Sequence, residues 1–251
     1  MNIKETLFKL SNAVSIGNIT DASVIAADKL SKYAKTTQDG ITVVGEIQGE
    51  GKYTLMLEAH IDEVGFVVTD IDDKGFLTVK NCGGIDLRSL PARAVTVHGK
   101  EKVTGVFCAT PPHLGGVTEY DDISALKIDT LLGEKAKEVI SVGDFVTFNT
   151  KAADLCGSRI TGKSLDNRAG VVCLLELAKR LSGKKLPFNI VFAFTDQEEL
   201  GCRGAGTAAF CVSPDEAIVL DVSFADAPDV PSNDCGKLSG GAMIGMSPIL
   251  D

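Results

Sequence analysis

The chain has 251 residues, of which 44% are hydrophobic, and this composition is typical of a well-packed globular protein with one large or two small domains. A formal net charge of −9 argues against nonspecific binding to nucleic acid or to an anionic membrane. No apolar stretch reaches the roughly 18 residues that a membrane-spanning helix needs, so neither nucleic acid nor a membrane is an expected partner.

The amino-terminal part predicts two helices followed by two strands. Apolar side chains at helical spacing predict a helix over residues 3–14. A second apolar stripe predicts another helix, which begins at Thr20 or Asp21. Apolar runs at residues 42–47 and 53–59 predict strands that are separated by a glycine-containing turn.

The next segment, residues 65–159, consists of short alternating runs broken by turn residues. Residues 66–79 and 94–107 each predict a β-hairpin, and one more strand is expected near residues 141–148. This pattern is typical of a small β-barrel-like domain.

Alternating strands and helices return after the β-rich segment. Asp166 opens a helix with one apolar face, which stops at Gly183. Strands are expected at residues 188–194 and 217–221, with a helix of small residues between them. Residues 239–251 predict a further strand followed by a loop.

Such alternation gives a largely parallel sheet. We therefore expect an α/β fold in which a mostly parallel-sheet domain, residues 1–64 and 160–251, carries an inserted small β-barrel-like domain, residues 65–159. Because no helix follows the last apolar residues to cover the sheet, we expect the chain to be incomplete at its carboxyl terminus.

Short polar motifs follow the apolar runs of the expected α/β domain. They supply one imidazole and several carboxylates: His60, Asp62, Asp166, Glu198, Glu199 and Asp221. The carboxyl ends of strands in open α/β sheets gather at one edge, so these side chains are expected to converge. Two like charges in contact repel by about 4 kcal/mol at an effective dielectric near 20, so the cluster needs protons or cations. Divalent metals accept imidazole and carboxylate ligands together.

Each motif also has a structural alternative when it is read alone. Asp166 is typical of a helix N-cap, and His60 with Asp62 is typical of the polar end of a strand. Glu198 and Glu199 are adjacent, so their side chains diverge and cannot do the same task at one point. Taken together, the motifs fit two metal ions about 3.5–4 Å apart that share a carboxylate, as in two-metal hydrolases.

Four longer strings contain these motifs: Glu58-Ala-His-Ile-Asp-Glu-Val-Gly-Phe66, Lys163-Ser-Leu-Asp-Asn-Arg-Ala-Gly170, Thr195-Asp-Gln-Glu-Glu-Leu-Gly-Cys-Arg-Gly-Ala205 and Leu220-Asp-Val222. They resemble the tetrahedral-aminopeptidase family, di-metal peptidases that include glutamyl aminopeptidases and that have often been labelled endoglucanases or cellulases. Their order and spacing match across nearly the whole chain.

The resemblance implies a role for each motif residue. The implied ligands of two divalent ions (zinc, cobalt or manganese) are His60, Asp166, Glu199 and Asp221. Asp166 would bridge the two ions, and Glu199 would bind the second ion. Glu198 would act as the general base, and Asp62 would orient His60.

The resemblance also implies one further ligand of the second ion, a histidine near the family's carboxyl terminus. The only other histidines of the chain, His98 and His113, lie in the expected inserted domain. That domain would drive dimerisation, and the family's dimers often assemble into dodecamers. The expected partners are therefore a peptide substrate and further copies of the chain.

Three functions follow from these observations. The first is a metal-dependent aminopeptidase that hydrolyses amino-terminal residues from peptides. The second is a glycoside hydrolase, which needs only two carboxylates, although the chain has no Trp and three Tyr for stacking on sugars. The third is an inactive oligomerising or peptide-binding module that lacks the last metal ligand.

Seven cysteines without a Cys-x-x-Cys pair predict reduced thiols and a cytoplasmic location.

Overall fold

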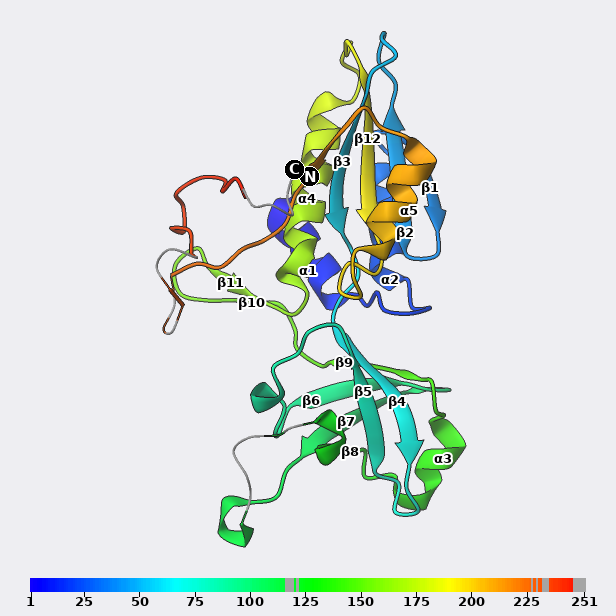
Figure 1. Cartoon of the computed structure of the whole chain (residues 1–251), viewed down its shortest axis with the longest axis vertical. Coiled ribbons are helices and arrows are strands. Elements are labelled where there is room, and N and C mark those ends of the chain that lie inside the picture. Colours follow the sequence, from blue (N-terminus) through cyan, green and yellow to red (C-terminus); the bar gives the residue numbers. More distant parts are fainter. Residues whose placement is uncertain (116–119, 121, 227, 229, 232–234, 246–251) are drawn as a thin grey trace.

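A computed structural model describes residues 1–115, 120, 122–226, 228, 230–231 and 235–245 of the chain. The described residues form two bodies, an α/β body and a β-barrel, and the chain crosses between them twice (Figure 1). None of the described helices is long and apolar enough to cross a lipid bilayer.

The described sheet of the α/β body is mixed and has the strand order β1-β2-β12-β3-β13. β3 pairs in parallel with β12 and with β13, whereas the β1–β2 and β2–β12 pairs are antiparallel. The apolar run of β12 suits its central position, where both faces of the strand are buried. The strands are β1 (Lys35–Asp39), β2 (Thr42–Ile47), β3 (Thr54–His60), β12 (Asn189–Thr195) and β13 (Glu216–Val219).

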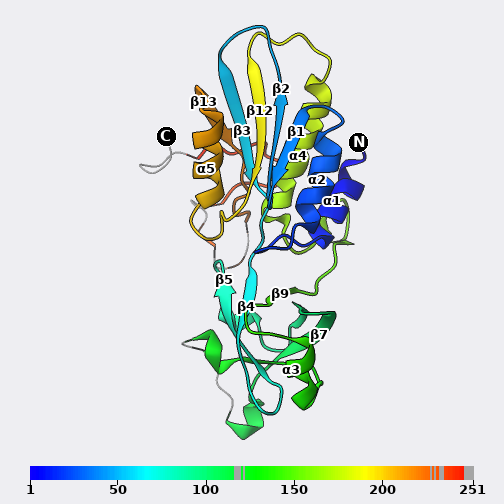
Figure 2. The same ribbon diagram turned by 90° about the vertical axis from the view of Figure 1, so that its right-hand side faces the viewer.

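Helices cover both faces of this sheet, with α1, α2 and α4 on one side and α5 on the other (Figure 2). The larger core lies between the sheet and the helices α1, α2 and α4, and it includes Leu10, Leu30, Leu175 and Phe192. A smaller core under α5 contains Met56, Ala193 and Ala208. The helices are α1 (Ile3–Asn12), α2 (Asp21–Leu30), α4 (Leu165–Leu181) and α5 (Arg203–Val212).

The second body is a closed barrel with the strand order β4-β5-β8-β7-β6-β9 among the described residues. Its interior is filled by side chains, and the ring of Phe66 packs edge-on against Phe107 and Phe148 at centroid distances of 5.0 and 5.5 Å. The strands are β4 (Gly65–Ile71), β5 (Leu77–Cys82), β6 (Ala94–His98), β7 (Lys102–Cys108), β8 (Lys127–Asp129) and β9 (Phe145–Phe148). Outside them lie the short helix α3 (Ala136–Val139) and the two-residue strands β10 (Ala153–Asp154) and β11 (Ile160–Thr161).

The two bodies are packed closely where they meet. Gly17, in the loop after α1, has a φ of +59°, and a Cβ at this position would overlap the ring of Phe145 on β9. A Cβ at Gly65 would lie 2.7 Å from the side chain of Ile16. The loop between α1 and α2 therefore contacts the first and last strands of the barrel.

The expected α/β fold with an inserted β-barrel-like domain is confirmed by this architecture. The division at residues 64/65 and 159/160 stays a prediction. Two short polar strands, β1 and β8, were not predicted, because Lys-Thr-Thr-Gln-Asp and Lys-Ile-Asp lack an apolar pattern. The antiparallel pairing of β2 with both β1 and β12 makes the sheet mixed.

The strand predicted near the end of the chain is wrong for residues 239–245, which form no strand. Gly241 has a φ of +106°, a conformation that interrupts an extended run. The remainder of that prediction, residues 246–251, lies outside the described part of the chain.

The Phe66 side chain is fully buried, so Phe66→Ala is expected to lower the free energy of unfolding by about 3–5 kcal/mol through lost contacts and a residual cavity. Urea denaturation measures this loss. Phe210→Ala is the matched control, because Phe210 is 86% exposed and its removal should change the stability by less than about 0.5 kcal/mol. Equal losses in the two variants would contradict the described barrel core.

Candidate metal centre

One edge of the α/β sheet gathers polar side chains from several chain segments. β3 and β12 run in parallel with Thr195 opposite His60, so both strands end at the same level. The segment after β12 carries Glu198 and Glu199, and Asp221 follows β13 by two residues. These polar side chains therefore lie at one edge of the sheet, at the carboxyl ends of its parallel strands, as is expected of α/β proteins.

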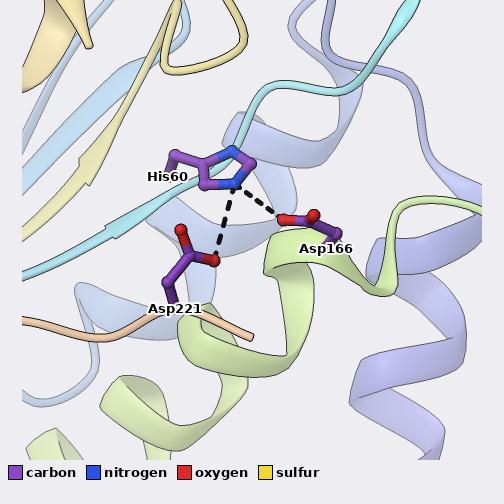
Figure 3. Close-up of side chains that lie close together, drawn as sticks. All are labelled: His60, Asp166 and Asp221. Carbon is purple, nitrogen blue, oxygen red and sulfur yellow. Dashed lines mark hydrogen bonds and ion pairs between the residues drawn. The ribbon is translucent and has the colours of Figure 1, made fainter. Parts of the chain in front are cut away.

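His60 lies at the centre of this edge, with Asp166 and Asp221 beside it (Figure 3). Its Nε2 atom lies 2.9 Å from Oδ1 of Asp166 and 3.9 Å from Oδ1 of Asp221. The His60 side chain is 2% exposed, whereas the two carboxylates remain partly open to solvent. One atom from each of the three residues lies within 4.8 Å of the others, so together they could hold a metal ion.

Asp166 does not serve as the N-cap of α4, the structural alternative for this residue. The N-cap position of α4 is Ser164, and the backbone angles of Asp166 and Asn167 are not helical. The Asp166 carboxylate contacts His60 instead. The side chain of Asn167 donates a hydrogen bond to the carbonyl of Leu220, which fastens this turn to the segment that carries Asp221.

The two adjacent glutamates extend the cluster. His60, Glu198 and Glu199 form a second group with one atom each within 4.8 Å of one another, and Oε2 of Glu198 lies 3.9 Å from Nε2 of His60. Asp166 and Glu199 line the same cavity of about 350 Å³, together with Phe148 of the barrel. The structure thus brings together all four predicted metal ligands and Glu198.

Asp62 contacts the opposite side of the imidazole. Its Oδ1 atom lies 3.3 Å from Nδ1 of His60, an ion-pair contact rather than a well-aligned hydrogen bond. The same carboxylate accepts hydrogen bonds from the backbone N–H groups of Glu198 and Glu199, at 3.2 and 3.3 Å. Asp62 therefore links the end of β3 to the segment after β12.

The charges of the cluster shift its pKa values in opposite directions. Burial alone lowers the pKa of His60, but the hydrogen bond with Asp166 and the contact with the Asp62 carboxylate outweigh burial and raise the pKa to about 10. Burial and the negative charge of Asp166 raise the pKa of Glu199 to about 7. Burial also raises the pKa of Asp221. Both acids thus resist ionisation.

This donor set fits a divalent cation. Two ligand atoms that each lie about 2.0–2.1 Å from a tetrahedral zinc ion are roughly 3.3 Å apart. The distances of 2.9 and 3.9 Å from the His60 nitrogen to its two aspartate partners bracket that separation. A cation between these atoms would replace the proton on His60 and relieve the repulsion among the carboxylates.

Sequence reasoning did not assign Glu58, a further acid of this region. Glu58 is 4% exposed, accepts a hydrogen bond from the Thr195 hydroxyl, and has a pKa raised by burial. It precedes His60 by two residues, so the strand periodicity places both side chains on one face. That periodicity was the available signal.

The sequence of this chain is similar to that of known aminopeptidases. Residues 42–249 match the family described as M42 glutamyl aminopeptidase. A putative aminopeptidase of Acetivibrio thermocellus is 37% identical over 191 residues, which cover 72% of this chain and 54% of that protein. The chain thus spans about half the length of the curated relatives it matches.

Solved structures agree with this match. An aminopeptidase from the archaeon Desulfurococcus kamchatkensis superposes with a TM-score of 0.85 and 32% identity, covering 92% of this chain and 66% of that one. The TET1 peptidase of Pyrococcus horikoshii, which can assemble into a tetrahedron or a large octahedral shell, gives a TM-score of 0.79 and 34% identity. The match covers 92% of this chain and 72% of the chain of that peptidase.

The raised pKa of His60 predicts a pH-dependent stability. The folded chain holds the His60 proton more tightly than the unfolded chain, so this stabilisation is complete below about pH 6.5 and is lost as the pH rises through about 10. Chelator-treated protein should therefore unfold at lower urea concentrations as the pH is raised across that range, and His60→Asn should flatten the decline.

His98→Asn is the control for this measurement. Burial lowers the pKa of His98, so the residue cannot cause a loss of stability above its ordinary pKa. A slope that persists in the His60 variant would show that other groups titrate in this range.

Proposed function

The chain belongs to the M42 glutamyl aminopeptidase family, and from that membership we propose that its His60 cluster binds divalent metal and hydrolyses amino-terminal residues from peptides. The observation that carries the proposal is the convergence of a buried imidazole with Asp166, Asp221, Glu198 and Glu199 at one sheet edge. The chain covers only part of the length of its relatives, so the peptidase activity is a proposal about the whole protein that carries the His60 cluster.

In this proposal two divalent ions, zinc, cobalt or manganese, share the cluster. His60 and Asp221 would hold the first ion, Glu199 would hold the second, and Asp166 would contribute to both. The group formed by His60, Asp166 and Asp221 supports the ligands of the first ion, and the cavity that Asp166 and Glu199 line together supports those of the second. Imidazole and carboxylate ligands suit all three metals.

When bound, the ions supply Lewis acidity to the scissile carbonyl and make the attacking water more acidic. Glu198 accepts the proton of that water and passes it to the departing amine. Asp62 holds the backbone of Glu198 and Glu199 while contacting the ring of His60, so one carboxylate positions the base and a ligand together.

The spacing of the carboxylates favours this reaction over glycoside hydrolysis. The paired carboxyl groups of glycosidases are about 5–5.5 Å apart in retaining enzymes and about 6.5–9.5 Å apart in inverting ones. Here the donor atoms of Asp166 and Asp221, and those of Glu198 and Glu199, lie within 4.8 Å of each other and of His60. That spacing suits a shared cation better than a sugar placed between two acids.

We also propose that copies of the chain associate, with the barrel as the dimerisation domain, and that the protein works in the cytoplasm. The assembly of the Pyrococcus horikoshii TET1 peptidase into closed shells supports the first proposal. Six cysteines form no disulfide, namely Cys82, Cys108, Cys156, Cys173, Cys202 and Cys211, which supports a reducing compartment.

Glu198→Gln should lower peptide turnover by about 10²–10⁴-fold, because the amide cannot accept the proton of the attacking water. Metal content should stay unchanged, since Glu198 is not a proposed ligand. Turnover of an aminoacyl p-nitroanilide and elemental analysis of the same samples test both expectations. Glu134→Gln, on the exposed surface of the barrel, is the matched control. Loss of metal from the Glu198 variant would identify Glu198 as a ligand instead.

Removal of metal distinguishes the proposed reaction from glycoside hydrolysis. A chelator should abolish hydrolysis of the p-nitroanilide, and cobalt, zinc or manganese should restore it. Carboxymethyl cellulose assayed in parallel should remain intact with and without the chelator. Cellulose hydrolysis that withstands chelation would overturn the proposed function.

A further inference from the structure

A buried carboxylate that the proposed reaction does not use lies directly after Asp62. The Glu63 side chain is 3% exposed, and its Oε2 atom accepts hydrogen bonds from Nζ of Lys163 at 2.5 Å and from Oγ of Ser164 at 2.8 Å. Its Oε1 atom accepts a hydrogen bond from the backbone N–H of Ser15 at 3.1 Å. Glu63 therefore joins three chain segments: the loop after α1, the end of β3 and the start of α4.

A second cation faces the same carboxylate. Arg168 is fully buried on α4, and its Nη2 atom lies 3.9 Å from Oε1 of Glu63. Its Nη1 atom donates a hydrogen bond to the carbonyl of Leu10, whereas its Nε and Nη2 atoms have no hydrogen-bond partner among the described residues. Two buried cations, Lys163 and Arg168, thus share one carboxylate. Removing that carboxylate would leave both charges uncompensated in a medium of low polarity.

These cations flank the proposed bridging ligand. Lys163 and Ser164 precede Asp166 by three and two residues, and Arg168 follows it by two. Between them, Ser164 has a φ of +55°, in the left-handed region that a non-glycine residue adopts only when its surroundings hold it there. Glu63 accepts the hydroxyl hydrogen bond of that same Ser164. The segment that carries Asp166 is therefore fastened to Glu63 on both sides.

We propose that Glu63 is a positioning residue that fixes Asp166 relative to His60, so that the two side chains form a site for a divalent cation. The inference rests on the proposed function for the identity of that site. Glu63 follows the end of β3, which carries His60, and it fastens the turn that carries Asp166. It therefore sets the separation of the two ligands, 2.9 Å from Oδ1 of Asp166 to Nε2 of His60. Its carboxylate oxygens accept hydrogen bonds from Ser15, Lys163 and Ser164, and Glu63 is not a proposed ligand.

If the ion pairs of Glu63 only stabilised the fold, breaking them would have a different effect on metal binding. Breaking them would lower the unfolding temperature and would leave the geometry of a bound metal unchanged in the folded fraction. The visible absorption of bound Co²⁺ reports ligand geometry directly, and it needs no catalytic activity. Co²⁺ titration of the folded chain, followed by absorption and checked by circular dichroism, separates the two roles.

Glu63→Gln keeps the shape of the side chain and removes its charge. We expect it to weaken Co²⁺ affinity by about 10–100-fold, the range found when partners of metal ligands are removed, and to alter the absorption spectrum. The double variant Glu63→Gln/Lys163→Met removes one buried cation with the carboxylate. It should recover at least part of the affinity and of the spectrum, because less charge is left unpaired.

Two further variants complete the experiment. Ser164→Ala removes a single hydrogen bond to Glu63, and it should change the Co²⁺ spectrum even if Glu63→Gln does not fold. Glu5→Gln/Lys9→Met breaks an ion pair whose side chains are both 58% exposed, and it should leave affinity and spectrum unchanged.

The outcomes are distinct. Unchanged Co²⁺ affinity and spectrum in folded Glu63→Gln, or in Ser164→Ala where Glu63→Gln does not fold, would overturn the positioning role while the proposed metal site stands. Failure of the unsubstituted chain to bind Co²⁺ would overturn the proposed site, and the positioning role with it.

Discussion

The parallel register of β3 with β12 and with β13 ends these strands at one edge of the sheet, with Thr195 opposite His60 and Val219 opposite Glu58. A shift of either strand by one residue would turn its side chains to the other face. The polar segments that follow the strands would then no longer meet. The alignment is held by burial, since β12 is enclosed on both faces and β3 contributes Leu57 and Ala59 to the main core.

Two groups of charged side chains meet at the end of β3. Carboxylates lie around His60, and their repulsion is the physical reason for expecting a cation there. Lys163 and Arg168 are buried beside Glu63. Asp62 and Glu63 are consecutive residues, and Asp62 contacts the first group whereas Glu63 contacts the second. The end of β3 therefore connects the two groups.

Much of this arrangement could be predicted from the sequence, because the strands before the motifs are strongly apolar and the motifs resemble those of a known family. The spacing of His60 and Asp62 predicted side chains that point the same way, and both contact the same cluster. The alternation of β3 was a signal for Glu58, which shares a face with His60. No such signal existed for Glu63, because a buried acidic residue looks identical in sequence to an exposed one and only the position of Lys163 distinguishes it.

The barrel interrupts the cluster in the order of the chain. His60 and Asp166 touch in space but are separated by 106 positions, most of which form the barrel. A ribosome adding about 5–20 residues per second delivers the imidazole several seconds before the carboxylate that contacts it. During that interval the nascent polypeptide carries His60 and Asp62, and the strands of the barrel are synthesised before Asp166. Assembly of the cluster is thereby postponed until most of the chain has been translated.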